Sequence, residues 1–171
     1  ITADGVNLEY EVFNKEDGEM YFNLGTHPAF MASEFPVTDY YLEFSEPETL
    51  DLYTLVGLTV AKETKPFLKN EKVIKITEDL FKDDALVFKG HKSEYLSLKN
   101  VNNSEEVKVS LKDFTWLGIW APPGAPFVCL EPWCGVADME DHNGDLTKKE
   151  AVNKLEKGGS FKRVMEIIVN K

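Results

Sequence analysis

Short segments of alternating apolar and polar residues recur along almost the whole chain, and this pattern limits the fold more than any other feature. Near the start, Leu8, Tyr10 and Val12 alternate with Glu9 and Glu11. Further strand candidates occupy residues 40–44, 48–53, 72–76, 85–88, 94–98, 106–111, 117–120, 127–131 and 163–169. Many short strands with turns between them predict an all-β antiparallel sandwich or barrel rather than alternating strands and helices.

Three local predictions follow from turns, charge and capping residues. The segment around residues 8–12, a turn in "NKEDGE" and the run "MYFNL" predict a β-hairpin. The charged stretch 62–72, "KETKPFLKNEK", is expected to be a solvated loop. Thr147 and Glu150 have the spacing of a capping box in front of "KKEAVNKL", so a short helix is expected there with Glu150 as part of its cap.

The length and charge of the chain limit the classes of protein that it can represent. Its 171 residues fit one domain, 1–171. A net charge of −11 repels phosphate backbones, so nucleic acid is not expected as a partner. No apolar run approaches the ~20 residues that a membrane helix needs, so no membrane partner is expected. The oligomeric state stays open.

The cysteines bear on the cellular compartment. Cys129 and Cys134 do not form a C-x-x-C motif, and we expect two reduced thiols in a cytoplasmic protein. A disulfide between them is the alternative.

His27 lies in an unusual context, the stretch "GTHPAF" at the end of a strand-like segment. Gly25 permits a bend and Pro28 fixes its own φ, so a histidine between them has little freedom. An imidazole has an ordinary pKa of ~6.5, which suits proton transfer near neutrality. The alternative is a histidine that only hydrogen-bonds to backbone at a sheet corner.

Glu131 ends the apolar run "FVCL" and is followed by Pro132 and Trp133. A carboxylate at the end of a buried strand is partly desolvated, which raises its pKa towards the range of a general base. Trp133 offers a flat apolar face that suits the C–H surface of a sugar ring. The alternative is a glutamate paired with a lysine beside a tryptophan that belongs to the core.

Asp83 and Asp84 precede another strand candidate. Neighbouring strand residues point to opposite faces, so at most one of the two aspartates faces a shared pocket. Asp84 has the parity of Leu86 and Phe88 if the strand extends back to it. The alternative is a pair of aspartates that begins a turn.

Metal sites are not expected from the spacing of the residues. A calcium loop with Gly144 in its sixth position would have Met139 in the first, which cannot bind a hard cation. The histidines also lack zinc-ligand spacing with either cysteine. We therefore expect no metal and no other cofactor.

Five stretches in order, "MYFNLGTHPAF", "YYLEF", "LFKDDALVFKG", "LGIWAPPGAPFVCLEPWCGVAD" and "GDLTKKEAVNKLEKGGSFK", make the chain similar to the aldose 1-epimerase (galactose mutarotase) family, in its bacterial branch. The similarity runs from about Leu8 to Ile168. It implies a galactose mutarotase-like supersandwich, an antiparallel β-sandwich with a carbohydrate site on one sheet face. It also implies that the family domain has further strands N-terminal to the segment that Ile1 begins, which carry a second active-site histidine and an arginine.

The resemblance implies the roles of individual residues. His27 matches the family's general acid and Glu131 its general base. Asp84 corresponds less closely to an aspartate that binds sugar hydroxyls. Trp133 and Phe30, which belong to the two matching motifs, are expected to contact the sugar.

The expected function is therefore interconversion of the α and β anomers of an aldohexose. The alternative is a carbohydrate-binding β-sandwich module without catalysis. A glycoside hydrolase that uses Glu131 with Asp84 would need two carboxyls ~5–9.5 Å apart. A phosphosugar substrate is disfavoured because Arg163 is the only arginine.

Overall fold

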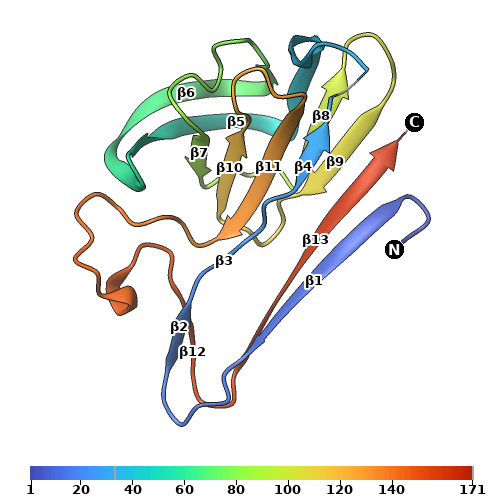
Figure 1. The fold of residues 1–171 in the computed structure, drawn as a ribbon. Helices are drawn as coiled ribbons and strands as arrows, with labels where there is room; N and C mark the ends of the chain where they lie inside the picture. Colours follow the sequence, from blue (N-terminus) through green and yellow to red (C-terminus); the bar gives the residue numbers. More distant parts are fainter. Residues whose placement is uncertain (33, 171) are drawn as a thin grey trace.

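The computed structural model describes residues 1–32 and 34–170, which form an all-β fold (Figure 1). The strands pair antiparallel, which confirms the predicted fold class. Helical elements in this described part are two 3-10 turns, η1 (Val37–Asp39) and η2 (Leu146–Lys148). The strands are β1 (Gly5–Phe13), β2 (Met20–Phe22), β3 (Leu24–Gly25), β4 (Ala29–Met31), β5 (Tyr40–Val56), β6 (Thr59–Lys75), β7 (Leu86–Lys89), β8 (Tyr95–Asn100), β9 (Glu106–Ser110), β10 (Trp116–Trp120), β11 (Phe127–Cys134), β12 (Asn153–Leu155) and β13 (Ser160–Asn170).

One large sheet contains most of these strands. Over the described residues it has 11 strands in the order β1-β13-β9-β8-β5-β7-β10-β11-β3, with β4 also on β11 and β6 on β5. Strands β2 and β12 form a separate pair. The sheet curls, so that β5 and β6 pass over one end of β7 and β10, while β1 and β13 reach away as a long ribbon (Figure 1).

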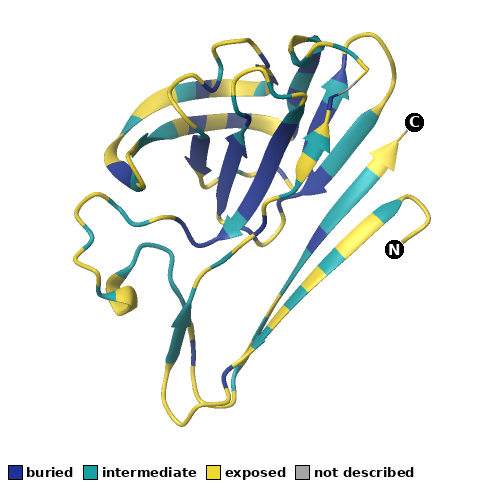
Figure 2. Cartoon of the chain, viewed as in Figure 1, coloured by how far each residue is buried: buried dark blue, intermediate teal, exposed yellow. Residues whose placement is uncertain are grey.

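The main core lies on one face of the central strands. Alternate side chains of β7, β10 and β11 are fully buried there, and Figure 2 shows these strands as the most buried part of the fold. They include Phe88, Leu117, Ile119, Val128 and Leu130, each 0% exposed. Burial of each such side chain contributes about 1.5–3 kcal/mol. This core holds the three strands rigidly, so that side chains on their opposite face have fixed positions.

The predicted hairpin between residues 8–12 and "MYFNL" is wrong. Strand β1 pairs with β13, and β2 pairs with β12. The buried side chain of Asn14 explains the path of the chain, because its Nδ2 donates hydrogen bonds to the carbonyls of Gly18 and Leu155. Asn14 N also donates to the Gly159 carbonyl at 3.0 Å. These bonds hold the end of β1 to the C-terminal segment instead of turning it back on itself.

The predicted loop at residues 62–72 is also wrong, because the stretch lies within β6. Among the named strands of the described residues, β6 pairs only with β5, apart from a single bridge between Val60 and Met139, and so it lies at a sheet edge. Lysines, glutamates and a proline are the residues with which proteins protect a sheet edge from further pairing. The charge that suggested a loop is thus a property of an edge strand.

The helix expected after Thr147 does not form. The side chain of Asp145 accepts a hydrogen bond from Thr147 N at 3.1 Å and caps only the short turn η2. Glu150 accepts a hydrogen bond from Lys89 Nζ at 2.7 Å instead of acting as a cap. The chain then continues into β12, where its pairing with β2 replaces helical hydrogen bonds.

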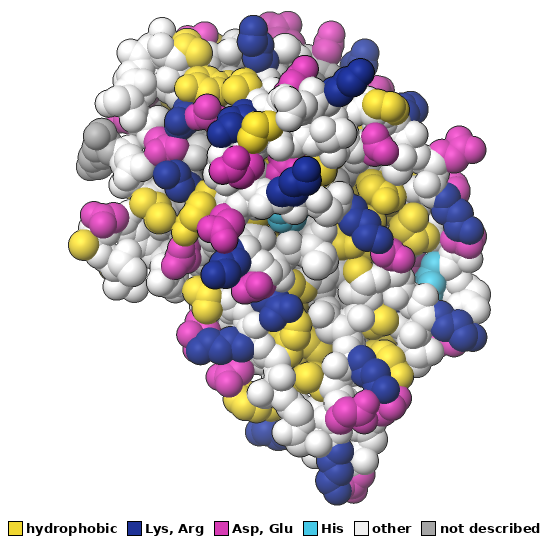
Figure 3. Space-filling model, turned by 180° about the vertical axis from the view of Figure 1, so that it is seen from behind, with side chains coloured by type: hydrophobic (Ala, Val, Ile, Leu, Met, Phe, Trp, Pro, Cys, Tyr) yellow, Lys and Arg dark blue, Asp and Glu magenta, His cyan; other side chains and the backbone are white. Residues whose placement is uncertain are grey.

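The structure shows where the charged side chains and the two cysteines lie. Acidic and basic side chains are interspersed on the face seen in Figure 3. Cys129 and Cys134 are both buried and free. Among the described residues, no helix has the length and the apolar character that crossing a membrane requires.

Candidate functional site

The candidate site lies on the face of β11 opposite to the main core. Glu131 is directly across from Gly118 of β10, and the same register brings Trp116 opposite Trp133. Since residues directly opposite in an antiparallel pair share a face, these four form one patch. Gly118 contributes no side chain, and the indole of Trp133 occupies the space above it.

The other flank of β11 brings in His27. Gly25 of β3 pairs with Trp133, and Ala29 of β4 pairs with Cys129. Strands β3 and β4 therefore keep one common register along β11. His27 lies midway between the two pairs, which puts it across from Glu131.

Two prolines explain why this edge strand is interrupted at His27. Pro28 and Pro132 have no N–H, so each strand lacks one donor of the ladder. The remaining bonds form: Thr26 N donates to the Pro132 carbonyl at 3.2 Å, and Leu130 N donates to the Pro28 carbonyl at 3.1 Å. The strand thus stays attached on both sides of the histidine.

Trp133 supplies the donor that Pro132 lacks. Its indole Nε1 donates a hydrogen bond to the Thr26 carbonyl at 3.2 Å. The buried hydroxyl of Thr26 donates to the Pro132 carbonyl at 2.9 Å. Thr26, which precedes His27, is therefore held to Pro132, which follows Glu131, by a side-chain hydrogen bond as well as by a backbone one.

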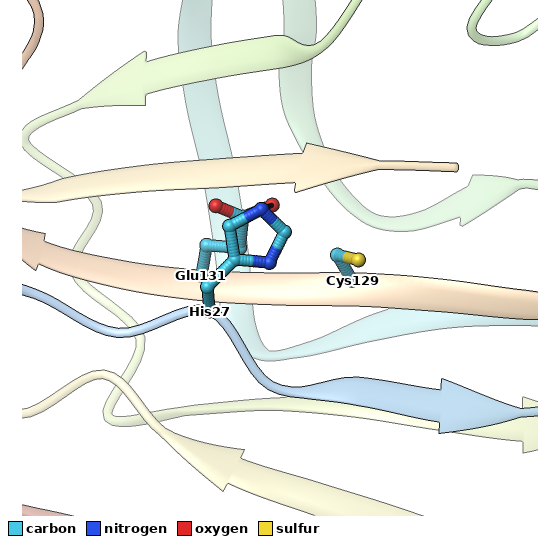
Figure 4. A group of neighbouring side chains, drawn as sticks. All are labelled: His27, Cys129 and Glu131. Atoms are coloured by element: carbon cyan, nitrogen blue, oxygen red, sulfur yellow. Dashed lines mark ion pairs between the residues drawn. The ribbon is translucent and has the colours of Figure 1, made fainter. Parts of the chain in front are cut away.

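His27 and Glu131 lie beside each other, and they form an ion pair when the imidazole is protonated (Figure 4). His27 Nε2 lies 3.5 Å from Glu131 Oε1, and the two side chains are 66% and 6% exposed. Burial raises the pKa of Glu131, and the nearby His27 opposes that rise. The arrangement joins a desolvated carboxyl, a stronger base than it is in water, to an imidazole that is open to solvent and to ligand. Such a pair can take a proton from one oxygen and give a proton to another.

Trp133 fits over the sheet because two of its neighbours are glycines. A Cβ at Gly118 would lie 2.5 Å from Trp133 Cη2, and a Cβ at Gly25 would lie 2.9 Å from its Cδ1. The half-buried indole therefore lies along the backbone of both flanking strands. A hollow of about 260 Å³ beside it is lined by Gly25, Val136 and others, but larger hollows lie elsewhere on the surface. The candidate site is defined by the two reactive groups, His27 and Glu131, and not by the volume of the hollow.

Two residues predicted from the sequence are not brought to this pair. Asp84 precedes β7, is exposed and has a φ of 101°, and its side chain accepts a hydrogen bond from Ala85 N. Phe30 pairs with Val128 and packs against the main core. Among the contacts of residues 1–32 and 34–170, none joins either side chain to His27 or Glu131. Their sugar contacts stay predictions.

Cys129 is a site residue that the sequence reasoning missed. It is two residues before Glu131 on the same strand and so on the same face. Its Sγ, a His27 ring nitrogen and a Glu131 oxygen all lie within 4.8 Å of one another. Spacing along the chain between His27 and the cysteines gave no sign of this. The signal available was the i, i+2 pair Cys129-x-Glu131 on a strand.

Comparisons with known sequences find relatives of about twice this length. No protein-family model matches the chain. The plasmid and chromosomal LacX proteins of Lactococcus lactis subsp. lactis are each 29% identical to it over 163 residues, which is 91% of this chain and 54% of the relative. The chain thus spans about half the length of the curated relatives that it matches.

Solved structures agree in fold over essentially the whole chain. A galactose mutarotase related enzyme from Lactobacillus acidophilus is 28% identical, with a TM-score of 0.90 over 100% of this chain and 59% of that one. A galactose mutarotase-like protein from Lactobacillus casei ATCC 334 also has a TM-score of 0.90, over 99% of this chain and 60% of that one. Its sequence is 21% identical, so this comparison is evidence for the fold only. In fold and in sequence the chain is therefore similar to a galactose mutarotase related enzyme, of which it covers 59%.

Proposed function

We propose that the protein is an aldose 1-epimerase, which interconverts the α and β anomers of an aldohexose. The observation that carries the proposal is the approach of His27 Nε2 to within 3.5 Å of Oε1 of the buried Glu131. The similarity to a galactose mutarotase related enzyme supports the same chemistry. We also propose that residues 1–171 belong to one domain and that the protein is cytoplasmic.

The reaction needs one acid and one base close together. In a cyclic aldose, the C1 hydroxyl and the ring oxygen are both bonded to C1. Glu131 takes the proton of the C1 hydroxyl, whose electrons form the C1 carbonyl, while the bond from C1 to the ring oxygen breaks. The protonated His27 gives its proton to the ring oxygen. Because the two oxygens are so close, an acid and a base that are nearly in contact suit them.

Ring closure reverses these transfers. The open aldehyde rotates about the C1–C2 bond, and the hydroxyl that was the ring oxygen attacks the other face of C1. His27 takes that hydroxyl's proton back, and Glu131 returns its proton to the carbonyl oxygen. Atoms and electrons balance without an oxidant, and each proton-transfer group contributes typically 10²–10⁴-fold to the rate.

The exposed imidazole of His27 is the group that moves to admit the sugar. Its side chain is 66% exposed, whereas Glu131 is held in β11 with 6% exposure. Rotation of the imidazole separates the pair without disturbing the sheet. The indole of Trp133, which is half-buried beside Glu131, supplies an apolar surface for the C–H face of the ring.

Anomer exchange in the full-length protein tests the proposal. Freshly dissolved α-glucose and α-galactose are followed by polarimetry or by NMR of the anomeric protons. We expect His27→Ala and Glu131→Gln each to lower kcat by at least about 10²-fold. The matched control is His142→Ala, which removes a histidine from a loop outside the site. Exchange at the parent rate in either site variant would remove the role assigned to that residue.

A carbohydrate-binding module is the second outcome of the same experiment. It predicts that sugars bind, as measured by calorimetry, while the parent protein leaves the rate of anomer exchange unchanged.

A further inference from the structure

Cys129 adds a third metal-binding side chain to the His27–Glu131 pair. It pairs with Ala29, the residue two positions after His27, and its thiol lies on the face that carries Glu131. The three donor atoms, a sulfur, a ring nitrogen and a carboxylate oxygen, all lie within 4.8 Å of one another. Figure 4 shows the three side chains on one side of β11.

The donor set has the chemistry of a zinc site. Sulfur, imidazole and carboxylate are the three ligand types of Zn²⁺, whereas calcium and magnesium take oxygen donors. Three protein ligands with a fourth position left for water are typical of an open zinc site. The open side here is the solvent side, because the His27 ring is 66% exposed.

The distances between the donors also fit. Tetrahedral coordination at zinc bond lengths separates neighbouring ligand atoms by roughly 3.3–3.8 Å. His27 Nε2 and Glu131 Oε1 are 3.5 Å apart, inside that range. The other separations in the set are at most 4.8 Å, and we expect side-chain rotations to close them. Cys129 and Glu131 are both buried in β11.

We propose that His27, Cys129 and Glu131 form a zinc-binding site, and that a bound zinc ion blocks the transfer of protons at this pair. The binding of zinc is independent of the proposed epimerase function, but the blocking of anomer exchange rests on it. Zinc would occupy the lone pairs that Glu131 and His27 need for proton transfer.

Binding requires that the Cys129 thiol lose its proton. Burial, with the nearby Glu131 charge, raises the pKa of Cys129 to about 11, so the free protein holds this group as a thiol at neutral pH. A coordinating thiol is deprotonated by the metal. The bond between sulfur and hydrogen breaks, the sulfur–zinc bond forms, and the proton passes to solvent.

The chain offers matched controls for two of the ligands. Cys134 is buried to a similar degree, but its Sγ donates to the Asp113 carbonyl at 3.4 Å. It lies an odd number of residues from Glu131 on the same strand, and so on the opposite face. His142 lies in the loop after β11 and serves as the control for His27.

Titration with Zn²⁺ and Co²⁺ tests the site in the reduced, full-length protein. We expect one zinc per chain by calorimetry, and with cobalt a near-ultraviolet charge-transfer band from the thiolate. Cys129→Ala should abolish that band and His27→Ala should weaken zinc binding at least about 10-fold, while Cys134→Ala and His142→Ala change neither. Because the His27 side chain is exposed, the His27 variant tests the site even if the Cys129 variant does not fold.

The outcomes separate this proposal from the proposed function. Absence of zinc binding, a band that persists in Cys129→Ala, or binding that is lost in Cys134→Ala or His142→Ala would overturn the site. Anomer exchange that stops at the zinc concentration filling the site, and returns with a chelator, supports both proposals. If zinc binding responds to the variants as expected, but the protein does not accelerate anomer exchange, the zinc site is supported and the proposed epimerase function is refuted.

Discussion

Gly118→Ala is the substitution whose effect follows most directly from the structure. The new Cβ would lie 2.5 Å from Cη2 of Trp133, where real Cβ contacts are essentially never below 3.0 Å. The indole must therefore move away from the sheet by at least about half an ångström. That movement strains the 3.2 Å hydrogen bond from Trp133 Nε1 to the Thr26 carbonyl, which holds the segment that carries His27.

The expected cost has two parts. Overpacking of a well-packed site costs typically about 1–3 kcal/mol, and a weakened hydrogen bond adds about 0.5–1.5 kcal/mol. We therefore expect the free energy of unfolding to fall by roughly 1.5–4.5 kcal/mol. For a chain of this length, that corresponds to a Tm lowered by roughly 3–18 °C. If the proposed function holds, kcat should fall with it, because His27 loses its alignment with Glu131.

Urea unfolding measures this cost, and a double-mutant cycle shows its origin. Gly118→Ala is compared in the parent protein and in a Trp133→Ala background, where the ring that causes the clash is gone. We expect a coupling of at least about 1 kcal/mol between the two positions. Gly18→Ala is the control, since a Cβ there meets nothing within 4 Å. A cost in the parent protein that equals the cost in the Trp133→Ala background would refute the reasoning.

Three further predictions concern other residues. Thr26→Val removes the buried hydroxyl that donates to the Pro132 carbonyl at 2.9 Å and should lower the free energy of unfolding by about 1–3 kcal/mol in urea. Burial lowers the pKa of His91 from its ordinary 6.5. Below pH 6.5 the unfolded chain therefore binds a proton that the folded chain does not. As the pH falls, the free energy of unfolding should decrease by up to about 1.4 kcal/mol per pH unit more steeply than in His91→Gln. Equal slopes in the two proteins would contradict this. Glu150→Gln breaks a partly exposed ion pair with Lys89 and should cost under about 1 kcal/mol, and a larger loss would show that Glu150 has another partner.

The strands could be predicted from the sequence because their signal is local. Alternation identified segments in β1, β5, β7, β8, β9, β10, β11 and β13 and at the end of β6, since side chains on a strand point to opposite faces in turn. The partner of each strand could not be predicted in the same way. Strand β1 pairs with β13 because buried Asn14 ties its end to the C-terminal segment, and nothing in the sequence near Asn14 specifies that contact.

Two local signals gave the wrong structure for physical reasons. Charge in residues 62–72 suggested a loop, because an edge strand and a solvated loop favour similar residues. The spacing of Thr147 and Glu150 suggested a helix cap, but Asp145 caps the turn and Lys89 binds the glutamate. In both cases the deciding partner is distant in the sequence or lies just outside the motif.

The candidate site could be predicted in part. The roles of His27 and Glu131 came from the resemblance of two motifs, and the structure brings these side chains together. Cys129 was missed, since only the register between β4 and β11 brings its thiol near His27. Asp84 could not be placed because a φ of 101° takes it out of the strand pattern that was assumed for it.

The pairing of β1 with β13 has a consequence for how the protein is made. During synthesis, residues 5–13 leave the ribosome about 150 residues before their partner, residues 160–170. Until that partner has emerged, this edge of the long strand β1 is unpaired with β13 and can associate with other nascent chains. Contacts between such remote segments also slow folding, because the entropy of closing a large loop is lost before any of these contacts forms. We therefore expect slow expression at low temperature, or a chaperone, to raise the yield of native protein.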